Sequence, residues 1–205
     1  DPNHPAIIFA TIWAARQGPW ENGAWNGPAS GLYKSTDGGT TWKKMTNGLP
    51  SATNDGLGRI GFTIAPSNSS RMYATVDAEK NGGIYRSDDA GESWYLLTSD
   101  GRLWGRGADF AEVKADPKNE NIVYSANVVM WKSVDGGKTW NKTLFVDDNT
   151  GCVDLSMDMN NPRILYAAMW DYRRLPWEVR SGGKGSGLYK STDGGETWEK
   201  IQNGL

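Results

Sequence analysis

The stretch Ser191-Thr-Asp193-Gly-Gly195-Glu-Thr197-Trp198 decides the fold, because the same phrase occurs four times in the chain. The other copies begin at Ser35, Ser87 and Ser133 and end at Trp42, Trp94 and Trp140. Successive tryptophans of the phrase are 52, 46 and 58 residues apart. A repeat of about 40 to 50 residues that contains several short strands is typical of β-propeller blades.

The phrase has the chemistry of a tight turn between two strands. Its aspartate can accept hydrogen bonds from backbone N–H groups two residues further on, and its glycines can adopt positive φ. The tryptophan begins the next strand, and its large ring can pack between strands or blades. The phrase is therefore expected to close a hairpin in each unit.

Apolar stretches upstream of each phrase predict the remaining strands. One stretch lies directly before the phrase, at 32–34, 84–86, 130–132 and 188–190. A second lies further upstream, at 7–10, 72–74, 122–124 and 164–167. A third stretch, with alternating apolar residues, precedes these in three units, at 60–64, 111–115 and 153–157.

These stretches predict an all-β chain, a β-propeller of four-stranded antiparallel blades. Residues 1–205 are expected to form one partial propeller with four blades, the first of which lacks its innermost strand. The approximate blades are 1–50, 51–100, 101–148 and 149–205. An open sheet edge exposes unpaired backbone groups. We therefore expect further blades, from the same or another chain, in a propeller of six to eight blades.

A longer period relates the first unit to the fourth. Both have a long connection between their second and third strands, and matching residues lie 156 or 157 positions apart. The matching pairs are Pro5/Pro162, Trp20/Trp177, Gly31/Gly187 and Trp42/Trp198. The period indicates either a duplicated block of three blades or a junction between corresponding parts of two propellers.

The composition argues against several classes of function. The formal net charge is −2 and the 22 Lys and Arg residues are scattered, so no nucleic-acid partner is expected. No apolar run approaches the roughly 18 residues that cross a bilayer, so no membrane insertion is expected. Cys152 is the only cysteine and His4 the only histidine. We therefore predict no metal site and no cofactor.

The connections opposite the Asp-containing turns are where function is expected, because long loops on a rigid scaffold commonly carry it. The two longest are residues 11–30 and 168–186. The candidate ligand-binding residues on this face are Trp13, Arg16, Trp20, Trp25, Arg59, Trp104, Arg106, Trp170, Arg173, Arg174 and Trp177. Aromatic faces beside arginines suit a glycan or a protein or peptide ligand. The alternative is that the tryptophans pack the long loops together.

The repeated phrase resembles that of the Asp-box (BNR) repeat superfamily. This superfamily includes sialidases, xyloglucan hydrolases, sortilin-type receptor ectodomains and photosystem assembly factors. The stretches 170–189 and 56–61 resemble large exported bacterial proteins that are sortilin-like or glycosyl-hydrolase-like. The resemblance implies a location outside the cytoplasm: extracellular, periplasmic or on the cell surface.

In this superfamily the Asp box is a structural turn away from the active face. The resemblance thus implies structural roles, and no catalytic ones, for the residues Asp37, Asp89, Asp135, Asp193, Trp42, Trp94, Trp140 and Trp198. Sialidases also carry an Arg-Ile-Pro motif, whereas here Arg59-Ile60 is followed by Gly61. Sialidase activity is therefore not expected.

A glycosidase needs two carboxyl groups about 5 to 9.5 Å apart. The candidates on the expected functional face are Glu21, Asp55, Asp109, Asp147, Asp148, Asp154, Asp171 and Glu178. The sequence does not indicate which two converge, so no catalytic residue is assigned.

Three functions are compatible with this sequence. The leading hypothesis is an exported propeller that binds a glycan or a protein through its Trp- and Arg-rich face, without catalysis. The first alternative is part of a glycoside hydrolase that acts on a polysaccharide. The second is a structural or assembly subunit of a larger complex.

Overall fold

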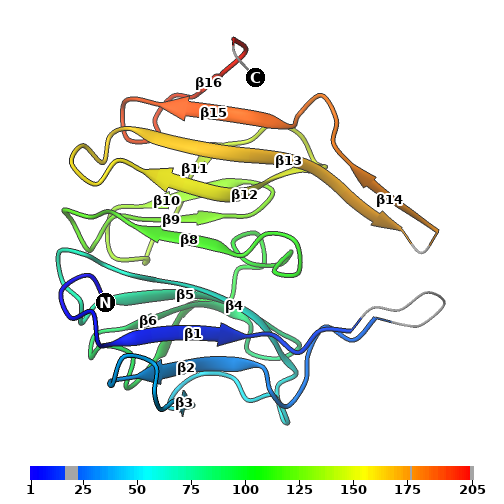
Figure 1. The fold of residues 1–205 in the computed structure, drawn as a ribbon. Helices are drawn as coiled ribbons and strands as arrows, with labels where there is room; N and C mark the ends of the chain where they lie inside the picture. The colour runs from blue at the N-terminus through cyan, green and yellow to red at the C-terminus, as the bar shows by residue number, and fades with distance from the viewer. Residues whose placement is uncertain (17–22, 176, 204–205) are drawn as a thin grey trace.

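The computed structural model of this chain describes residues 1–16, 23–175 and 177–203. These residues form antiparallel β-sheets that follow one another along the chain, and none of them is in an α-helix. Figure 1 shows the sheets as consecutive layers, with the first and last sheets at opposite ends. Over this part of the chain, no helix has the length and apolarity needed to span a membrane.

We call the sheets blades 1 to 4 in chain order. Blade 1 contains β1 (Ile8–Ile12), β2 (Gly31–Ser35) and β3 (Lys43–Met45). Blade 2 contains β4 (Leu57–Ile64), β5 (Met72–Ala78), β6 (Gly83–Ser87) and β7 (Tyr95–Thr98). Blade 3 contains β8 (Glu112–Ala115), β9 (Val123–Ala126), β10 (Met130–Ser133) and β11 (Asn141–Leu144). Blade 4 contains β12 (Thr150–Met157), β13 (Leu165–Leu175), β15 (Gly187–Ser191) and β16 (Glu199–Lys200), and β14 (Glu178–Ser181) pairs with β13.

The predicted fold class is confirmed. Blades 2 and 3 are four-stranded and antiparallel, and blade 1 has three strands and lacks the innermost one. The structure differs from the expectation at 168–186, which the sequence indicated as a loop. There β13 continues to Leu175 and pairs with β14, so the connection is a hairpin that projects from the body of blade 4 (Figure 1).

The turn at Asp135 illustrates the hydrogen bonds of the Asp boxes. The Asp135 carboxylate accepts hydrogen bonds from the Ser133 hydroxyl (2.8 Å), the Thr139 backbone N–H (2.9 Å) and the Thr139 hydroxyl (2.6 Å). Gly137 has φ +86°, a conformation that L side chains rarely adopt. Because the hydrogen bonds favour the ionised form, the pKa of Asp135 falls to about 2.

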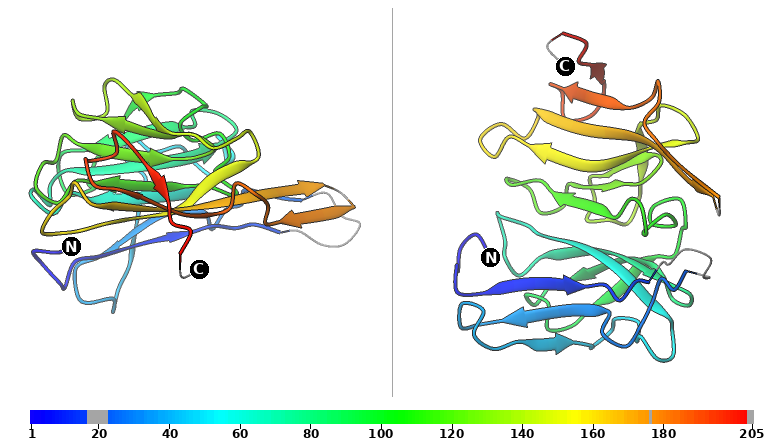
Figure 2. Two further views of the ribbon diagram at one scale, coloured as in Figure 1. Left: turned by 90° about the horizontal axis from the view of Figure 1, so that it is seen from above. Right: turned by 45° about the vertical axis from the view of Figure 1, so that its right-hand side comes forward.

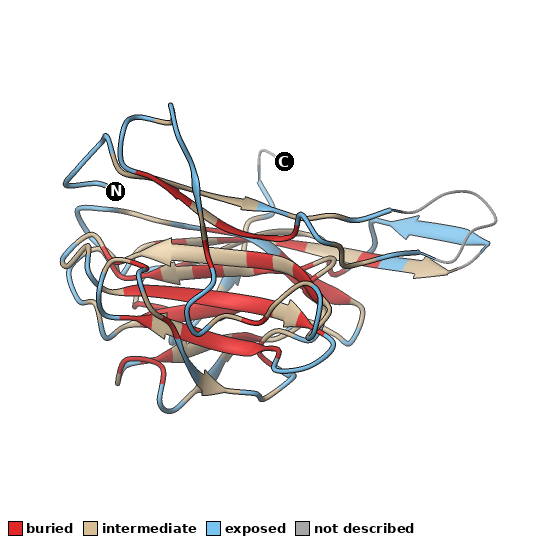
Figure 3. Ribbon diagram, turned by 90° about the horizontal axis from the view of Figure 1, so that it is seen from below, coloured by how far each residue is buried: buried red, intermediate tan, exposed pale blue. Residues whose placement is uncertain are grey.

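The hydrophobic core lies between consecutive blades. The tryptophans after the boxes of blades 2, 3 and 4 contribute to it, as Trp94 shows by packing with Leu32 and Met45 of blade 1. The Trp94 side chain is only 4% exposed. In Figure 3 the buried segments run along the strands of the layered body, whereas β14 is exposed. Each blade therefore depends on its neighbour to bury its apolar surface.

The longer sequence period has a structural counterpart in blades 1 and 4. The isolated bridge between Arg16 and Ala24 matches the hairpin pair Arg173 and Arg180, at offsets of 157 and 156 residues. In blade 1 the Ser30 hydroxyl accepts a hydrogen bond from the Ala14 backbone N–H, and Ser186 and Asp171 make the same contact in blade 4. The two connections leave the body on the same side (Figure 2).

Candidate functional site

An open cleft lies on the side of the molecule opposite the Asp-box turns. Its volume is about 380 Å³. The lining comes from four separate parts of the chain: the end of the blade 1 connection, the start of β4 with the residue before it, the junction of β5 with its following turn, and the segment that leads into β8. The residues are Trp25, Asn26, Gly56, Gly58, Asp77, Ala78, Glu79, Gly105, Arg106, Gly107, Ala108 and Asp109.

Asp77 is the half-buried carboxylate of this cleft. A Cβ atom at Gly107 would lie 2.6 Å from the Asp77 Cβ atom, so the absence of a side chain there makes room for Asp77. Among the described residues, none donates a hydrogen bond or forms an ion pair with the Asp77 carboxylate. Burial without a compensating partner raises the pKa of Asp77.

Asp109 lies in the same cleft but has the opposite environment. The Arg106 guanidinium donates a hydrogen bond to one Asp109 carboxylate oxygen at 2.8 Å. The Arg174 guanidinium lies 3.9 Å from the other oxygen. Arg106 also donates to the Tyr172 carbonyl at 3.0 Å, which links the cleft to β13. The cleft thus holds Asp77, whose carboxylate pairs with no described cation, and Asp109, which lies between two arginines.

The rim of the cleft joins blade 1 to blade 2. The Asn26 amide donates a hydrogen bond to a Glu79 carboxylate oxygen at 2.7 Å. Trp25 stacks with Trp13 at 6.2 Å between ring centroids, and the Trp13 indole N–H donates to the Trp25 carbonyl at 2.7 Å. These contacts fix the position of the Trp25 backbone at the edge of the cleft.

Two arginines cover the faces of this tryptophan pair. The Arg59 guanidinium lies 5.8 Å from the Trp13 ring centroid, and the Arg174 guanidinium lies 5.2 Å from that of Trp25. Arg59 also donates to the Ala108 carbonyl at 3.3 Å. Such stacking is attractive and rigidifies both partners. Trp13 and Trp25 therefore pack against each other and against these two arginines.

The other candidate residues are distributed around this region. The Trp104 ring packs against Gly82, and Trp170 stacks on Tyr172 with ring centroids 4.0 Å apart. Trp177, beside β14, is 79% exposed. Arg173 is exposed and lies opposite Arg180 in the backbone pairing of the hairpin. Arg16 lies opposite Ala24 in an isolated β-bridge. Trp20 lies outside the described residues.

Most of the candidate carboxylates have local structural contacts or lie on the open surface. Asp55 accepts hydrogen bonds from Ser51 and Asn81, Asp147 from Asn149 and Thr150, and Asp171 pairs with Arg180. Asp148, Asp154 and Glu178 are exposed, and Glu21 lies outside the described residues. Of the eight candidates, Asp109 lines the cleft.

Sequence reasoning missed Asp77 and Glu79. Both lie where β5 passes into its short connection, on the face that the strand order had identified as functional. Their position in a connection on that face could have identified them. The sequence analysis instead favoured the two longest connections, 11–30 and 168–186. Over the described residues, no cluster of three or more His, Cys, Asp or Glu side chains could hold a metal.

Comparison with known families agrees with the turn geometry. The family model described as BNR/Asp-box repeat matches residues 33–44 and 189–200. The chain belongs to the Asp-box (BNR) repeat β-propeller superfamily. This Asp-box propeller is 35% identical to the xyloglucanase Xgh74A of Acetivibrio thermocellus over 97% of its own length and 22% of that enzyme. It is 34% identical to sortilin of Danio rerio, over 55% of its length and 13% of sortilin.

Solved structures support the same fold. The crystal structure of an ancestral GH74 enzyme superposes with a TM-score of 0.62, with 19% identity, over 100% of this Asp-box propeller and 23% of that chain. The described chain spans between 19% and 23% of the length of the first xyloglucanases it matches. The similarity thus covers nearly all of this chain but only about a fifth of the length of its relatives.

Proposed function

We propose that this chain contributes a substrate-binding cleft to a glycoside hydrolase that acts on xyloglucan or a related polysaccharide. The observation that carries the proposal is the pairing, in one open cleft, of a half-buried carboxyl without a cation and a carboxylate between two arginines. The similarity to xyloglucanases over 83% to 97% of the chain supports the choice of substrate.

The two carboxyl groups suit different tasks in glycoside hydrolysis. A carboxyl whose pKa is raised by burial can remain protonated and donate its proton to the glycosidic oxygen. Asp77 has that environment. Asp109, whose charge the Arg106 guanidinium balances, can orient sugar hydroxyls or a water molecule. In this proposal Asp77 is the acid and Asp109 is the polar group that positions the sugar.

The test measures the release of reducing ends from xyloglucan by the wild-type chain and by the variants Asp77→Asn, Asp109→Asn and Asp148→Asn. Asp148 is exposed and serves as the matched control. We expect Asp77→Asn to lower the rate at least about a hundredfold, with Asp148→Asn unchanged. Equal rates for Asp77→Asn and wild type would refute the assignment of Asp77.

Binding without catalysis is the second candidate function. It is supported by Trp177, a residue that is 79% exposed and can stack on a sugar or a peptide side chain. Retention of the chain on immobilised xyloglucan, with no release of reducing ends by any preparation, would favour this function. Loss of retention in Trp177→Ala would assign it to the hairpin. The proposed location outside the cytoplasm follows from the same resemblance to exported proteins.

A further inference from the structure

The carboxyl group of Asp77 lies close to two glycines that belong to different segments. A Cβ atom at Gly58, in β4, would lie 3.4 Å from one Asp77 carboxylate oxygen. A Cβ atom at Gly107, in the segment that leads into β8, would lie 3.2 Å from the same oxygen and 3.1 Å from the carboxyl carbon. Both glycines are buried. We call Gly58 and the Gly107–Ala108 backbone the clamp of Asp77, because they contact its carboxyl group from two separate segments.

The part of the clamp in β4 contains a β-bulge. The register of β4 against β5 shifts between Leu57 and Ile60, so Gly58 and Arg59 both stand opposite the single residue Asp77. A bulge redirects the side chains at the extra residue, and bulges are over-represented next to active sites. Here the bulge places a glycine against the carboxyl group and directs the next side chain towards blade 3.

The part of the clamp in blade 3 is held by that next side chain. Gly107 and Ala108 lie between β7 and β8, outside any strand. Over the described residues, the hydrogen-bond donor to their carbonyl groups is Arg59. Its Nη1 atom lies 3.3 Å from the Ala108 oxygen and 3.5 Å from the Gly107 oxygen. The residue that follows one half of the clamp in sequence therefore holds the other half in place.

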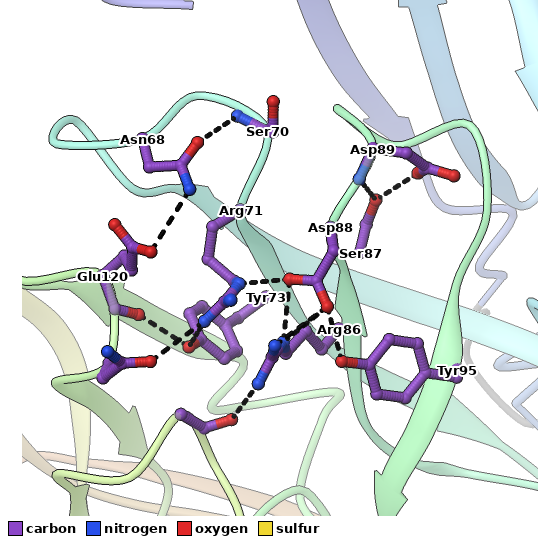
Figure 4. A network of polar contacts seen from close by, with 12 residues as sticks. Asn68, Ser70, Arg71, Tyr73, Arg86, Ser87, Asp88, Asp89, Tyr95 and Glu120 are labelled. Atoms are coloured by element: carbon purple, nitrogen blue, oxygen red, sulfur yellow. Dashed lines mark hydrogen bonds and ion pairs between the residues drawn. The ribbon is translucent and has the colours of Figure 1, made fainter.

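A second arginine spans the same junction on the Asp-box side. Arg86 of blade 2 donates to the Gly136 carbonyl of blade 3 at 3.3 Å, and Asp88 balances its charge at 2.9 Å (Figure 4). Within the described chain, no carboxylate forms an ion pair with Arg59, whose guanidinium lies 5.8 Å from the Trp13 ring centroid. Both arginines tie blade 2 to blade 3, but only Arg59 does so beside the cleft.

We propose that Arg59 is a positioning residue that holds the Gly107–Ala108 backbone against the Asp77 carboxyl group. Its stack on Trp13 fixes the guanidinium, and its hydrogen bonds fix the backbone. The clamp limits the access of water to the carboxyl group, and burial without a cation favours the protonated form. Arg59 thus acts through the clamp and not on the substrate. This inference rests on the proposed hydrolase function for its purpose, but the clamp can be tested without a substrate.

The sign of the change on removal of Arg59 separates the clamp from a direct effect of charge. Burial raises the pKa of Asp77, and the other charged groups that line the cleft are Glu79, Arg106 and Asp109. Loss of a nearby cation would raise the pKa of Asp77 further, because a cation favours the carboxylate. Loss of the clamp would lower the pKa of Asp77, because water would then solvate the carboxylate.

The experiment is an NMR titration of the Asp77 carboxyl carbon in protein labelled with ¹³C-aspartate, with the resonance assigned by its absence in Asp77→Asn. We expect Arg59→Ala to move the midpoint to lower pH. Arg59→Lys, which can still donate to a carbonyl, should move it less. Arg86→Ala, which removes the arginine on the Asp-box side of the same junction, is the matched control and should leave the midpoint unchanged.

A second variant opens the clamp from the other side. The methyl group of Gly107→Ala would lie 2.6 Å from the Asp77 Cβ atom, so the two segments have to separate. The midpoint should again move to lower pH, although Arg59 is intact. Near-UV circular dichroism verifies that each variant is folded, and Gly107→Ala decides the test should Arg59→Ala not fold.

Hydrolysis of xyloglucan distinguishes failure of the clamp from failure of the proposed function. Arg59→Ala should lower the rate at pH 7 about three- to tenfold and move the alkaline limb of the pH–rate profile to lower pH. An Asp77 midpoint that is unchanged or raised in the clamp variants would overturn the inference, whatever the activity. A lowered midpoint without hydrolysis by any preparation would support the clamp and refute the proposed function instead.

Discussion

The guanidinium of Arg174 lies over the indole ring of Trp25, with 5.2 Å between the guanidinium carbon and the ring centroid. Arg174 belongs to β13 of blade 4, and Trp25 lies in the connection between β1 and β2 of blade 1. The two residues are 149 positions apart in the sequence. The stack therefore joins the first and last blades of the described chain beside the cleft.

Removal of this stack should loosen the hairpin of blade 4. Arg174 also donates to the Tyr172 hydroxyl at 2.7 Å, so Arg174→Ala removes both a cation–π contact and a hydrogen bond. We expect a loss of about 1–2 kcal/mol in the free energy of unfolding, measured by urea denaturation. Trp25 fluorescence should shift to longer wavelength. Arg173→Ala, on the exposed face of the same strand, should change neither quantity.

The Asp boxes predict a specific loss of stability in acid. The pKa values of Asp37 and Asp135 are lowered to about 2 by their hydrogen bonds. A lowered pKa contributes stability that is present above the unfolded value near 3.8 and is lost as the pH falls through the folded value. The melting temperature should therefore fall between about pH 4 and pH 2.

Asp135→Asn tests the source of this acid sensitivity. The amide cannot ionise, so the variant should be less stable than wild type at pH 6 and the difference should shrink towards pH 2. A constant difference across this range would show that the Asp135 charge contributes nothing to the pH dependence.

The ionised Asp77 carboxylate is expected to lower the stability of the folded state, although the proposed hydrolysis uses this residue. Its pKa is raised by burial, so its ionisation destabilises the folded state as the pH rises through the folded pKa. We expect Asp77→Asn to raise the melting temperature by roughly 2 °C at pH 7. At pH 3, where the carboxyl of the wild type is protonated, the two proteins should melt together. A lower melting temperature for Asp77→Asn at pH 7 would contradict this account.

Gly61 is predicted to be intolerant of any side chain. A Cβ atom there would lie 1.7 Å from the Ala111 carbonyl oxygen in the segment leading into β8, so the backbones of blades 2 and 3 would have to separate. Gly61→Ala should cost about 2–4 kcal/mol of unfolding free energy in urea denaturation. Gly101→Ala, where a Cβ atom meets nothing within 4 Å, should leave the stability within about 0.5 kcal/mol of wild type.

The sequence predicted the strands well because a hairpin is a local structure. The phrase that ends at Trp140 contains the turn aspartate, the glycines and the first residues of the next strand, so pattern and structure coincide. The structure of the connection at 168–186 was less predictable from the sequence. There β13 is extended by cross-strand pairing, as between Arg173 and Arg180. The sequence between these two residues contains no strong turn motif.

The candidate site was less predictable than the fold. Asp109 was among eight carboxylates that the strand order placed on one face, but no local pattern separated it from Asp148 or Asp171. Asp77 has no motif around it. Its properties arise from Gly107, which lies 30 residues away in sequence and leaves space for its side chain. The sequence placed Trp13, Trp25, Arg59 and Arg174 among the candidates for this face, but it did not indicate which arginine stacks on which tryptophan.

The sequence by itself determined the unit of this protein: a turn whose Asp, Gly and Trp satisfy their bonding within eight residues, repeated four times along the chain. That information is local, because hydrogen bonds of the box join residues two to four positions apart. The tertiary structure alone decided which side chains meet. The cleft with Asp77 and Asp109 and the stack of Arg174 on Trp25 arise only when separate blades pack together. Burial and ion pairing between distant segments depend on that packing, and no single repeat encodes it.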